Sequence, residues 1–164
     1  MAANTLWASD ALPPTIIAQV HLPLEKVGSG IYRKFGFSIY RATLWAPGGT
    51  WGADRPYALE LHYLRSLSQD TLVDAVVDSI EDQNITDAST LASWKTELTQ
   101  TLPAVEDGDV IVGLTVPGKK SLLFFNGKQV ASIEDQAFSK AFFNIWLGDD
   151  ADQDLRAKLL GSAR

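Results

Sequence analysis

Ala137-Phe-Ser-Lys-Ala-Phe-Phe-Asn-Ile-Trp-Leu-Gly148 is the stretch of this sequence that says most about its fold. Apolar side chains recur along it at the spacing of an amphipathic helix, which packs one stripe against a core. Asp135 precedes the stretch, where an acidic residue is favourable to the helix dipole, and Gly148 is a natural helix end. A shorter helix capped by Asp152 is expected to follow and to end at Gly161. The buried stripe of the first helix is expected to contain Phe138, Ala141, Phe142 and Ile145.

The sequence just before this helix predicts antiparallel strands. Asn126-Gly127 lies between two apolar runs and is a strong hairpin signal, because both central positions of a type I′ turn need positive φ. Pro117-Gly118 is a second turn signal between apolar runs. Three consecutive strands are therefore expected, over residues 110–116, 121–125 and 128–133.

The middle of the chain predicts a strand and two helices. Residues 57–63 alternate between apolar and polar side chains, as in a half-buried strand. Ser68 can cap a first helix, and a second helix is expected to start at Asp87 or Ser89 and to stop before Pro103.

The pattern is less regular nearer the start. A run of β-branched residues predicts a strand from Thr15 to Leu22, and Gly28-Ser29-Gly30 predicts a turn. From Ile31 to Trp45 the apolar parity switches midway, and a β-bulge at Gly36 is expected to cause the switch.

Length and composition predict one folded domain. The chain has 164 residues, of which 46% are hydrophobic and 21% charged, and this is ordinary globular composition. Residues 1–14 show no sustained hydrophobic period and are expected to form a flexible lead-in. The single domain is then expected over residues 15–161.

The charge balance and missing residue types exclude several functions. A net charge of −6 would repel a phosphate backbone, so we expect no nucleic-acid partner. The apolar runs are too short to span a membrane. The chain has no cysteine and only two histidines, on separate expected strands, so we expect no metal and no cofactor. The location is expected to be periplasmic or secreted if a signal peptide was removed, and otherwise cytoplasmic.

A group of cationic and hydroxyl side chains at the ends of aromatic strands is the best candidate for a ligand site. An arginine at the mouth of an apolar pocket can hold a carboxylate or an oxyanion through two hydrogen bonds, and a tyrosine can orient it. The alternative is that both arginines are surface residues whose stems cover apolar side chains. The candidates are Arg33, Tyr40, Tyr32, Tyr63 and Arg65.

Several blocks of this sequence, in order and over roughly residues 15–161, resemble those of bacterial chalcone isomerase-like proteins. Their order and spacing make the match more specific than any single motif. The blocks are Gly28–Arg33, Phe35–Phe37, Ile39–Trp45, Tyr57–Arg65, Phe125–Lys128 and Ala141–Gly148.

The resemblance implies an α+β fold: an open-faced, β-sandwich-like antiparallel sheet with helices packed on one side and a ligand cleft between them. The family includes plant enzymes that cyclise chalcones and non-catalytic relatives that bind fatty acids. The family has an arginine that contacts the ligand. Its best match here is Arg33, one position later than in the family, and Tyr32 occupies the position where the arginine is expected. At the position where the plant enzymes have a threonine, this chain has Tyr40. The tyrosine makes the chain more similar to the fatty-acid-binding branch.

The resemblance therefore favours a monomer that binds a small amphipathic ligand, fatty-acid-like or polyphenol-like, without catalysis. One alternative is an intramolecular lyase of the chalcone isomerase type, in which Arg33 stabilises a phenolate during ring closure. Another is an interaction module that uses an exposed Trp45–Trp51 loop, since aromatic side chains favour interfaces.

Overall fold

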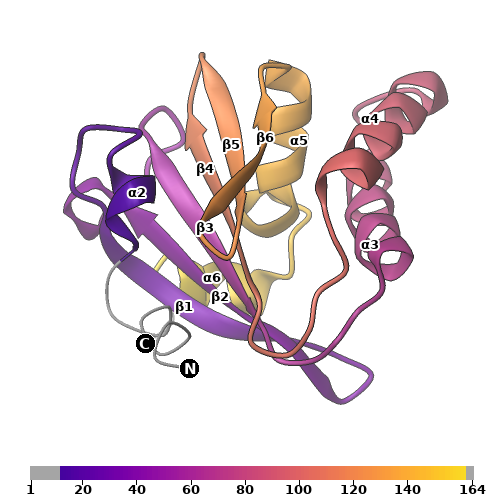
Figure 1. Cartoon of the computed structure of the whole chain (residues 1–164), viewed down its shortest axis with the longest axis horizontal. Helices are drawn as coiled ribbons and strands as arrows, with labels where there is room; N and C mark the ends of the chain where they lie inside the picture. The colour runs from indigo at the N-terminus through magenta and orange to yellow at the C-terminus, as the bar shows by residue number, and fades with distance from the viewer. Residues whose placement is uncertain (1–11, 162–164) are drawn as a thin grey trace.

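Six antiparallel strands form one sheet, in which each strand lies beside its neighbours in the sequence (Figure 1). The computed structural model describes residues 12–161. Its strands, in chain order, are β1 (Glu25–Lys34), β2 (Phe37–Ala46), β3 (Tyr57–Tyr63), β4 (Val110–Val116), β5 (Lys120–Phe125) and β6 (Lys128–Ile133). The expected antiparallel α+β class is confirmed.

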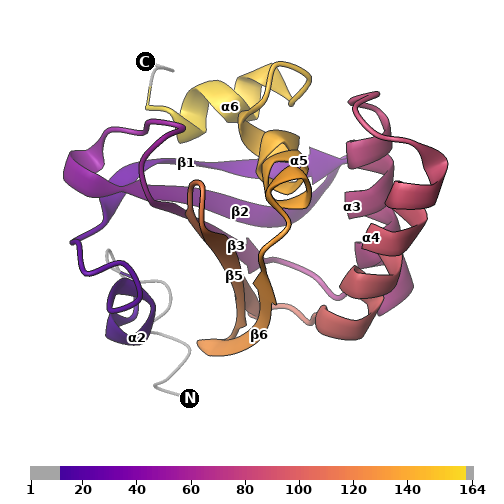
Figure 2. The same ribbon diagram turned by 90° about the horizontal axis from the view of Figure 1, so that it is seen from above.

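Four helices cover one face of the sheet, and a short helix lies against the other face (Figure 2). Within residues 12–161, no helix is both long enough and apolar enough to cross a bilayer. The helices on the covered face are α3 (Gln69–Glu81), α4 (Ala88–Thr101), α5 (Gln136–Leu147) and α6 (Gln153–Leu159). The short helix is α2 (Pro14–Ile17), and a 3₁₀ turn, η1 (Pro47–Gly49), follows β2.

Local capping signals explain where these four helices begin. The side chains of Ser68 and Asp87 accept hydrogen bonds from the N–H groups of the third residue beyond each of them, at the starts of α3 and α4. Asp135 and Asp152 cap α5 and α6 in the same way, each accepting from two N–H groups. Each side chain satisfies backbone donors that have no partner within the helix.

The segment before β1 differs from the prediction. The strand expected from Thr15 to Leu22 is wrong, because Pro14 begins α2 in its place. Proline is favourable at the first helical position, since its φ is already helical and its missing N–H has no partner there. Ile16 is fully buried on the face of the sheet away from α3–α6. Of the expected lead-in, residues 1–11 lie outside the described residues.

The turn expected at Gly28-Ser29-Gly30 is also wrong, because these residues lie inside β1. A Cβ atom on Gly28 would lie 2.1 Å from the carbonyl oxygen of Lys158, so the glycine lets α6 lie directly against the strand. A glycine inside a strand often marks such a close approach.

The run from Ile31 to Trp45 is a hairpin of two strands. Phe35 and Gly36 form its two-residue turn, with φ of 53° and 80°. The pairing changes from Tyr32 opposite Tyr40 to Arg33 opposite Ser38, which leaves Ile39 as an extra residue on β2. The bulge therefore lies in β2, and the prediction of a bulge at Gly36 is wrong.

Candidate functional site

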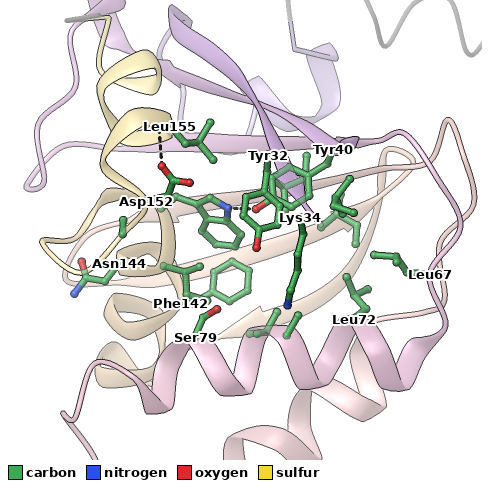
Figure 3. A pocket seen from close by; sticks show the side chains of 18 of the residues that line it. Tyr32, Lys34, Tyr40, Leu67, Leu72, Ser79, Phe142, Asn144, Asp152 and Leu155 are labelled. Atoms are coloured by element: carbon green, nitrogen blue, oxygen red, sulfur yellow. Dashed lines mark hydrogen bonds between the residues drawn. The ribbon is translucent and has the colours of Figure 1, made fainter. Parts of the chain in front are cut away.

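A cavity of about 400 Å³ lies between the sheet and the helices on its covered face (Figure 3). Strands β1 to β4 supply one wall, and α3, α5 and α6 supply the others. Cavities of this size commonly hold drug-sized or lipid-like molecules. The apolar residues of its lining, tyrosines and tryptophan aside, are Ile39, Leu61, Leu67, Leu72, Ala75, Val76, Leu102, Ile111, Phe142, Ile145, Ala151 and Leu155.

Three tyrosines from neighbouring strands form a cluster on the sheet wall of this cavity. The rings of Tyr32 and Tyr40 lie opposite each other in the β1–β2 hairpin and stack, with centroids 5.1 Å apart. Tyr63, opposite Tyr40 on β3, meets it edge-on with centroids 5.6 Å apart. Register therefore brings together three residues that are far apart in the sequence.

The Tyr40 hydroxyl is held in place by α5. It accepts a 2.8 Å hydrogen bond from the indole Nε1 of Trp146 (Figure 3). Burial raises the pKa of Tyr40 well above its usual value, and the nearby Tyr32 and Asp152 add to the rise against the opposing effect of Trp146. Tyr40 is therefore a neutral phenol at physiological pH. Because its oxygen already accepts from Trp146, its own proton is free to be donated to a ligand.

Tyr63 is the most buried member of the cluster, with 2% of its surface exposed. Burial also raises the pKa of Tyr63, so it too stays neutral. The buried polar part of the sheet wall thus includes the uncharged hydroxyl groups of Tyr40 and Tyr63, which can hydrogen-bond to a ligand oxygen without a buried charge.

Four charged residues line the cavity and are solvent-exposed, which places them at its mouth. Lys34 is the only cation among the described lining residues, and its side chain extends from β1 towards α3 (Figure 3). The three carboxylates are Asp82, Asp150 and Asp152. Asp152 is already engaged as the cap of α6.

The structure brings the three predicted tyrosines to the cavity but not the two predicted arginines. Arg33 is exposed and lies between Tyr32 and Lys34, both of which line the cavity. Successive side chains of a strand point to opposite faces, so Arg33 is directed away. Arg65 follows the end of β3, and its guanidinium lies 4.4 Å from the ring centroid of Phe37. Neither Arg33 nor Arg65 is therefore among the residues that line the cavity.

Sequence reasoning missed Lys34 and Trp146 as site residues. Lys34 is two positions after Tyr32 and so shares its face of the strand. The alternation of strand side chains could therefore have indicated Lys34. The role of Trp146 as a hydrogen-bond donor depends on a contact between α5 and β2, which no local pattern reveals.

On the opposite face of the sheet, the carboxyl group of Glu60 is buried and accepts a 2.9 Å hydrogen bond from Trp45 Nε1. Burial raises the pKa of Glu60, against the opposing effects of Trp45 and the charge of Lys26. Trp45 is thus a core residue, and the expectation that it lies in an exposed docking loop is wrong. Trp51 is half-buried and packs edge-on against Tyr57.

Among the residues that the structure describes, no group of three or more histidine and carboxylate side chains could hold a metal ion. The cavity residues themselves offer apolar contact and neutral hydroxyl groups, with one ammonium group and three carboxylates exposed at the mouth. This arrangement can bind an amphipathic molecule through non-covalent contacts.

The family model described as chalcone isomerase-like matches residues 11–161 of the sequence. The chain belongs to the chalcone isomerase-like family. The cavity therefore lies in a chalcone isomerase-like domain that covers nearly all of the chain.

A solved structure supports the same fold. The crystal structure of a fatty-acid binding protein from Arabidopsis thaliana superposes on this chalcone isomerase-like chain with a TM-score of 0.69 and 13% sequence identity. The match covers 94% of this chain and 91% of that chain. A search of curated proteins finds no match.

Proposed function

We propose that this protein binds an amphipathic small molecule, fatty-acid-like in shape, in the cavity between the sheet and α3, α5 and α6, without transforming it. The observation that carries the proposal is the cavity itself: about 400 Å³, mostly apolar, with hydroxyl groups on one wall. Its similarity in fold to a fatty-acid binding protein supports the same function.

The polar head of the ligand is proposed to lie between the tyrosine cluster and Lys34. Tyr40 can donate its proton because Trp146 occupies one acceptor position of its oxygen. Lys34 supplies a positive charge at the mouth, where a carboxylate can meet it while remaining partly hydrated. The apolar tail then extends along Leu72 and Phe142. No arginine is among the described residues that line the cavity, so the lyase alternative lacks its proposed oxyanion partner.

Native mass spectrometry of gently purified protein tests the proposal directly. We expect a bound amphipathic species, or uptake of an added saturated fatty acid or fatty alcohol after delipidation. A clean apo mass together with no uptake of either probe would refute the binding function.

A matched pair of variants on α3 locates the site. Val76 and Val77 are adjacent and half-buried, but only Val76 lines the cavity. Val76→Trp is expected to weaken binding at least about tenfold, a change of about 1.4 kcal/mol, because the indole occupies ligand volume. Val77→Trp serves as the control for general disturbance of the helix. Equal loss in both variants would place the ligand elsewhere.

The role of Lys34 is tested by comparing two ligands with the same tail. Lys34→Gln is expected to weaken binding of a fatty acid several-fold and to leave binding of the matching fatty alcohol unchanged. Displacement of a fluorescent fatty-acid analogue gives both affinities. An equal effect on the two ligands would show that the ammonium group does not meet the carboxylate.

The bacterial branch of the family, the periplasmic or secreted location and the monomeric state are parts of the same proposal. The absence of cysteine is compatible with an oxidising compartment but does not require one. Cell fractionation checks the location, and light scattering on the purified protein checks the monomer. Detection only in the cytoplasmic fraction would contradict the proposed location.

A further inference from the structure

The turn of the β1–β2 hairpin exposes two phenylalanines. Phe35 is 88% exposed and Phe37 is 57% exposed. The hairpin extends beyond the end of β3, whose last pair in the ladder joins Tyr63 to Tyr40 (Figure 1). The hairpin tip, defined here as residues 33–37, therefore projects from the sheet with its aromatic side chains in solvent.

The backbone at this tip makes phenylalanine an unfavourable choice. Phe35 and Gly36 have φ of 53° and 80°, and the β5–β6 turn, Asn126-Gly127, has nearly the same pair, 48° and 87°. Asparagine tolerates positive φ well, whereas a bulky residue there is strained. In the β1–β2 turn, Phe35 therefore brings both backbone strain and an exposed apolar surface. The β5–β6 turn has the favourable residue, Asn126, at the same position. Folding does not account for Phe35.

Basic side chains surround the two rings, although the protein as a whole is acidic. Lys34 Nζ lies 5.6 Å from the centroid of Phe35, and the Arg65 guanidinium lies 4.4 Å from that of Phe37. Arg33 is exposed beside them. Within residues 12–161, none of the three cations forms a salt bridge. In a chain of net charge −6, this is a local concentration of positive charge beside exposed aromatic rings.

We propose that the hairpin tip, together with Arg65, docks the protein on the surface of an anionic lipid bilayer. Exposed aromatic rings partition into the interface between headgroups and acyl chains, and nearby cations pair with anionic headgroups. In this proposal the protein lies on the bilayer surface and does not span the bilayer.

This docking places the mouth of the cavity next to the bilayer. Lys34 belongs to both the hairpin tip and the cavity lining, and Tyr32, two residues earlier in β1, also lines the cavity. The acidic turn at residues 106–109 bonds to Tyr63 rather than to the tip. Carboxylates repel anionic lipid, and the mouth itself carries Asp82, Asp150 and Asp152. Contact is therefore expected through the tip and Arg65 and not through these mouth residues.

Vesicle flotation tests the proposal. Wild-type protein is expected to bind vesicles of phosphatidylcholine mixed with phosphatidylglycerol, to bind phosphatidylcholine alone weakly, and to be released by salt. Arg33→Gln is expected to lower partitioning about fivefold, as expected for one cation near an anionic surface. No binding of the wild type to the anionic vesicles would overturn the proposal.

Phe35→Asn is the decisive variant, because it inserts the residue that this type of turn prefers. Its thermal midpoint is expected to equal or exceed that of the wild type, while vesicle binding falls roughly tenfold or more through loss of the buried ring. The control is Ile85→Asn, since Ile85 is 54% exposed in the turn between α3 and α4, away from the tip. That variant is expected to bind vesicles as the wild type does.

Two outcomes would overturn the assignment of the tip. One is full vesicle binding by Phe35→Asn. The other is a wild-type dimer that Phe35→Asn converts to a monomer without any vesicle binding, which would make the tip a contact between two copies of the chain. The Val76→Trp variant separates this proposal from the cavity function, because blocking the cavity is expected to leave vesicle binding unchanged.

Discussion

Replacement of Gly28 by alanine tests whether α6 is held in place by its close approach to β1. The added Cβ would lie 2.1 Å from the carbonyl oxygen of Lys158 and 2.8 Å from that of Leu159. Both are backbone atoms, so no side-chain rotation can relieve the contact. The helix would have to move away from the strand by roughly 1.5 Å to restore an ordinary separation.

The expected cost follows from two opposing effects. Overpacking a tight contact costs about 1–3 kcal/mol, and here the fixed backbone atoms favour the upper half of that range. Alanine inside a strand recovers roughly 0.5–1 kcal/mol, because glycine loses more conformational freedom on folding. The φ of Gly28 is not positive, so alanine brings no backbone strain of its own. We expect a net loss of roughly 2 kcal/mol.

Gly30→Ala is the matched control two residues along the same strand. Its Cβ would lie 2.9 Å from Leu155 Cδ1, 3.1 Å from Lys158 Cδ and 3.2 Å from Lys158 Cβ, which are all side-chain atoms and none of them as close as the carbonyl oxygens beside Gly28. We expect its stability to stay within about 1 kcal/mol of the wild type, because side-chain movement and the gain from alanine offset the contact. Urea unfolding followed by circular dichroism measures both variants. A Gly28→Ala protein as stable as the wild type, or one less affected than Gly30→Ala, would refute this account of the α6–β1 packing.

Three further changes test other contacts by urea or thermal unfolding. Tyr40→Phe leaves the Trp146 indole N–H without its acceptor and is expected to cost about 1–3 kcal/mol; an unchanged midpoint would argue against the bond. Glu60→Gln keeps an acceptor for Trp45 but cannot ionise. Because burial raises the pKa of Glu60 in the folded state, the wild type loses stability as pH rises from the ordinary carboxyl range through that pKa, so the advantage of the variant should grow over that window. Parallel curves for the two proteins would contradict this. Asp135→Ala removes the cap of α5 and also the acceptor of a hydrogen bond from Trp94 Nε1, so it should cost about 1–3 kcal/mol. Asp135→Asn keeps one oxygen for the cap and should recover part of this loss, and equal losses in the two would count against capping.

Elements specified by local chemistry could be predicted from the sequence. The Asn126-Gly127 hairpin is confirmed, with positive φ at both positions. The caps at Ser68 and Asp152 are confirmed as well, and Asp135, expected only to favour the helix dipole, proves to cap α5. In each case a side chain satisfies neighbouring backbone groups, or a residue tolerates an unusual φ, so the cause lies within a few residues of the effect.

Features that depend on distant contacts could not be predicted in this way. Gly28 has the chemistry of a turn residue, and only the carbonyl groups of α6 explain why it lies inside a strand. Tyr32, Tyr40 and Tyr63 line the cavity, and the sequence indicated them because they lie near the ends of recognisable strands. Arg33 is the best match to the arginine of the family, but one position along a strand reverses the direction of the side chain, so Lys34 and not Arg33 faces the cavity.

The docking of α6 on β1 also has a consequence for the order in which the chain folds. Every strand pair forms between sequence neighbours, so the sheet can assemble as it is synthesised. The contact between β1 and α6 does not follow this order. Helix α6 is the last of the described helices to be synthesised, whereas β1 is the first strand. β1 is an edge strand of the finished sheet, and until α6 forms its glycine-containing surface is also uncovered. That interval is when the nascent protein is most open to pairing with the wrong chain.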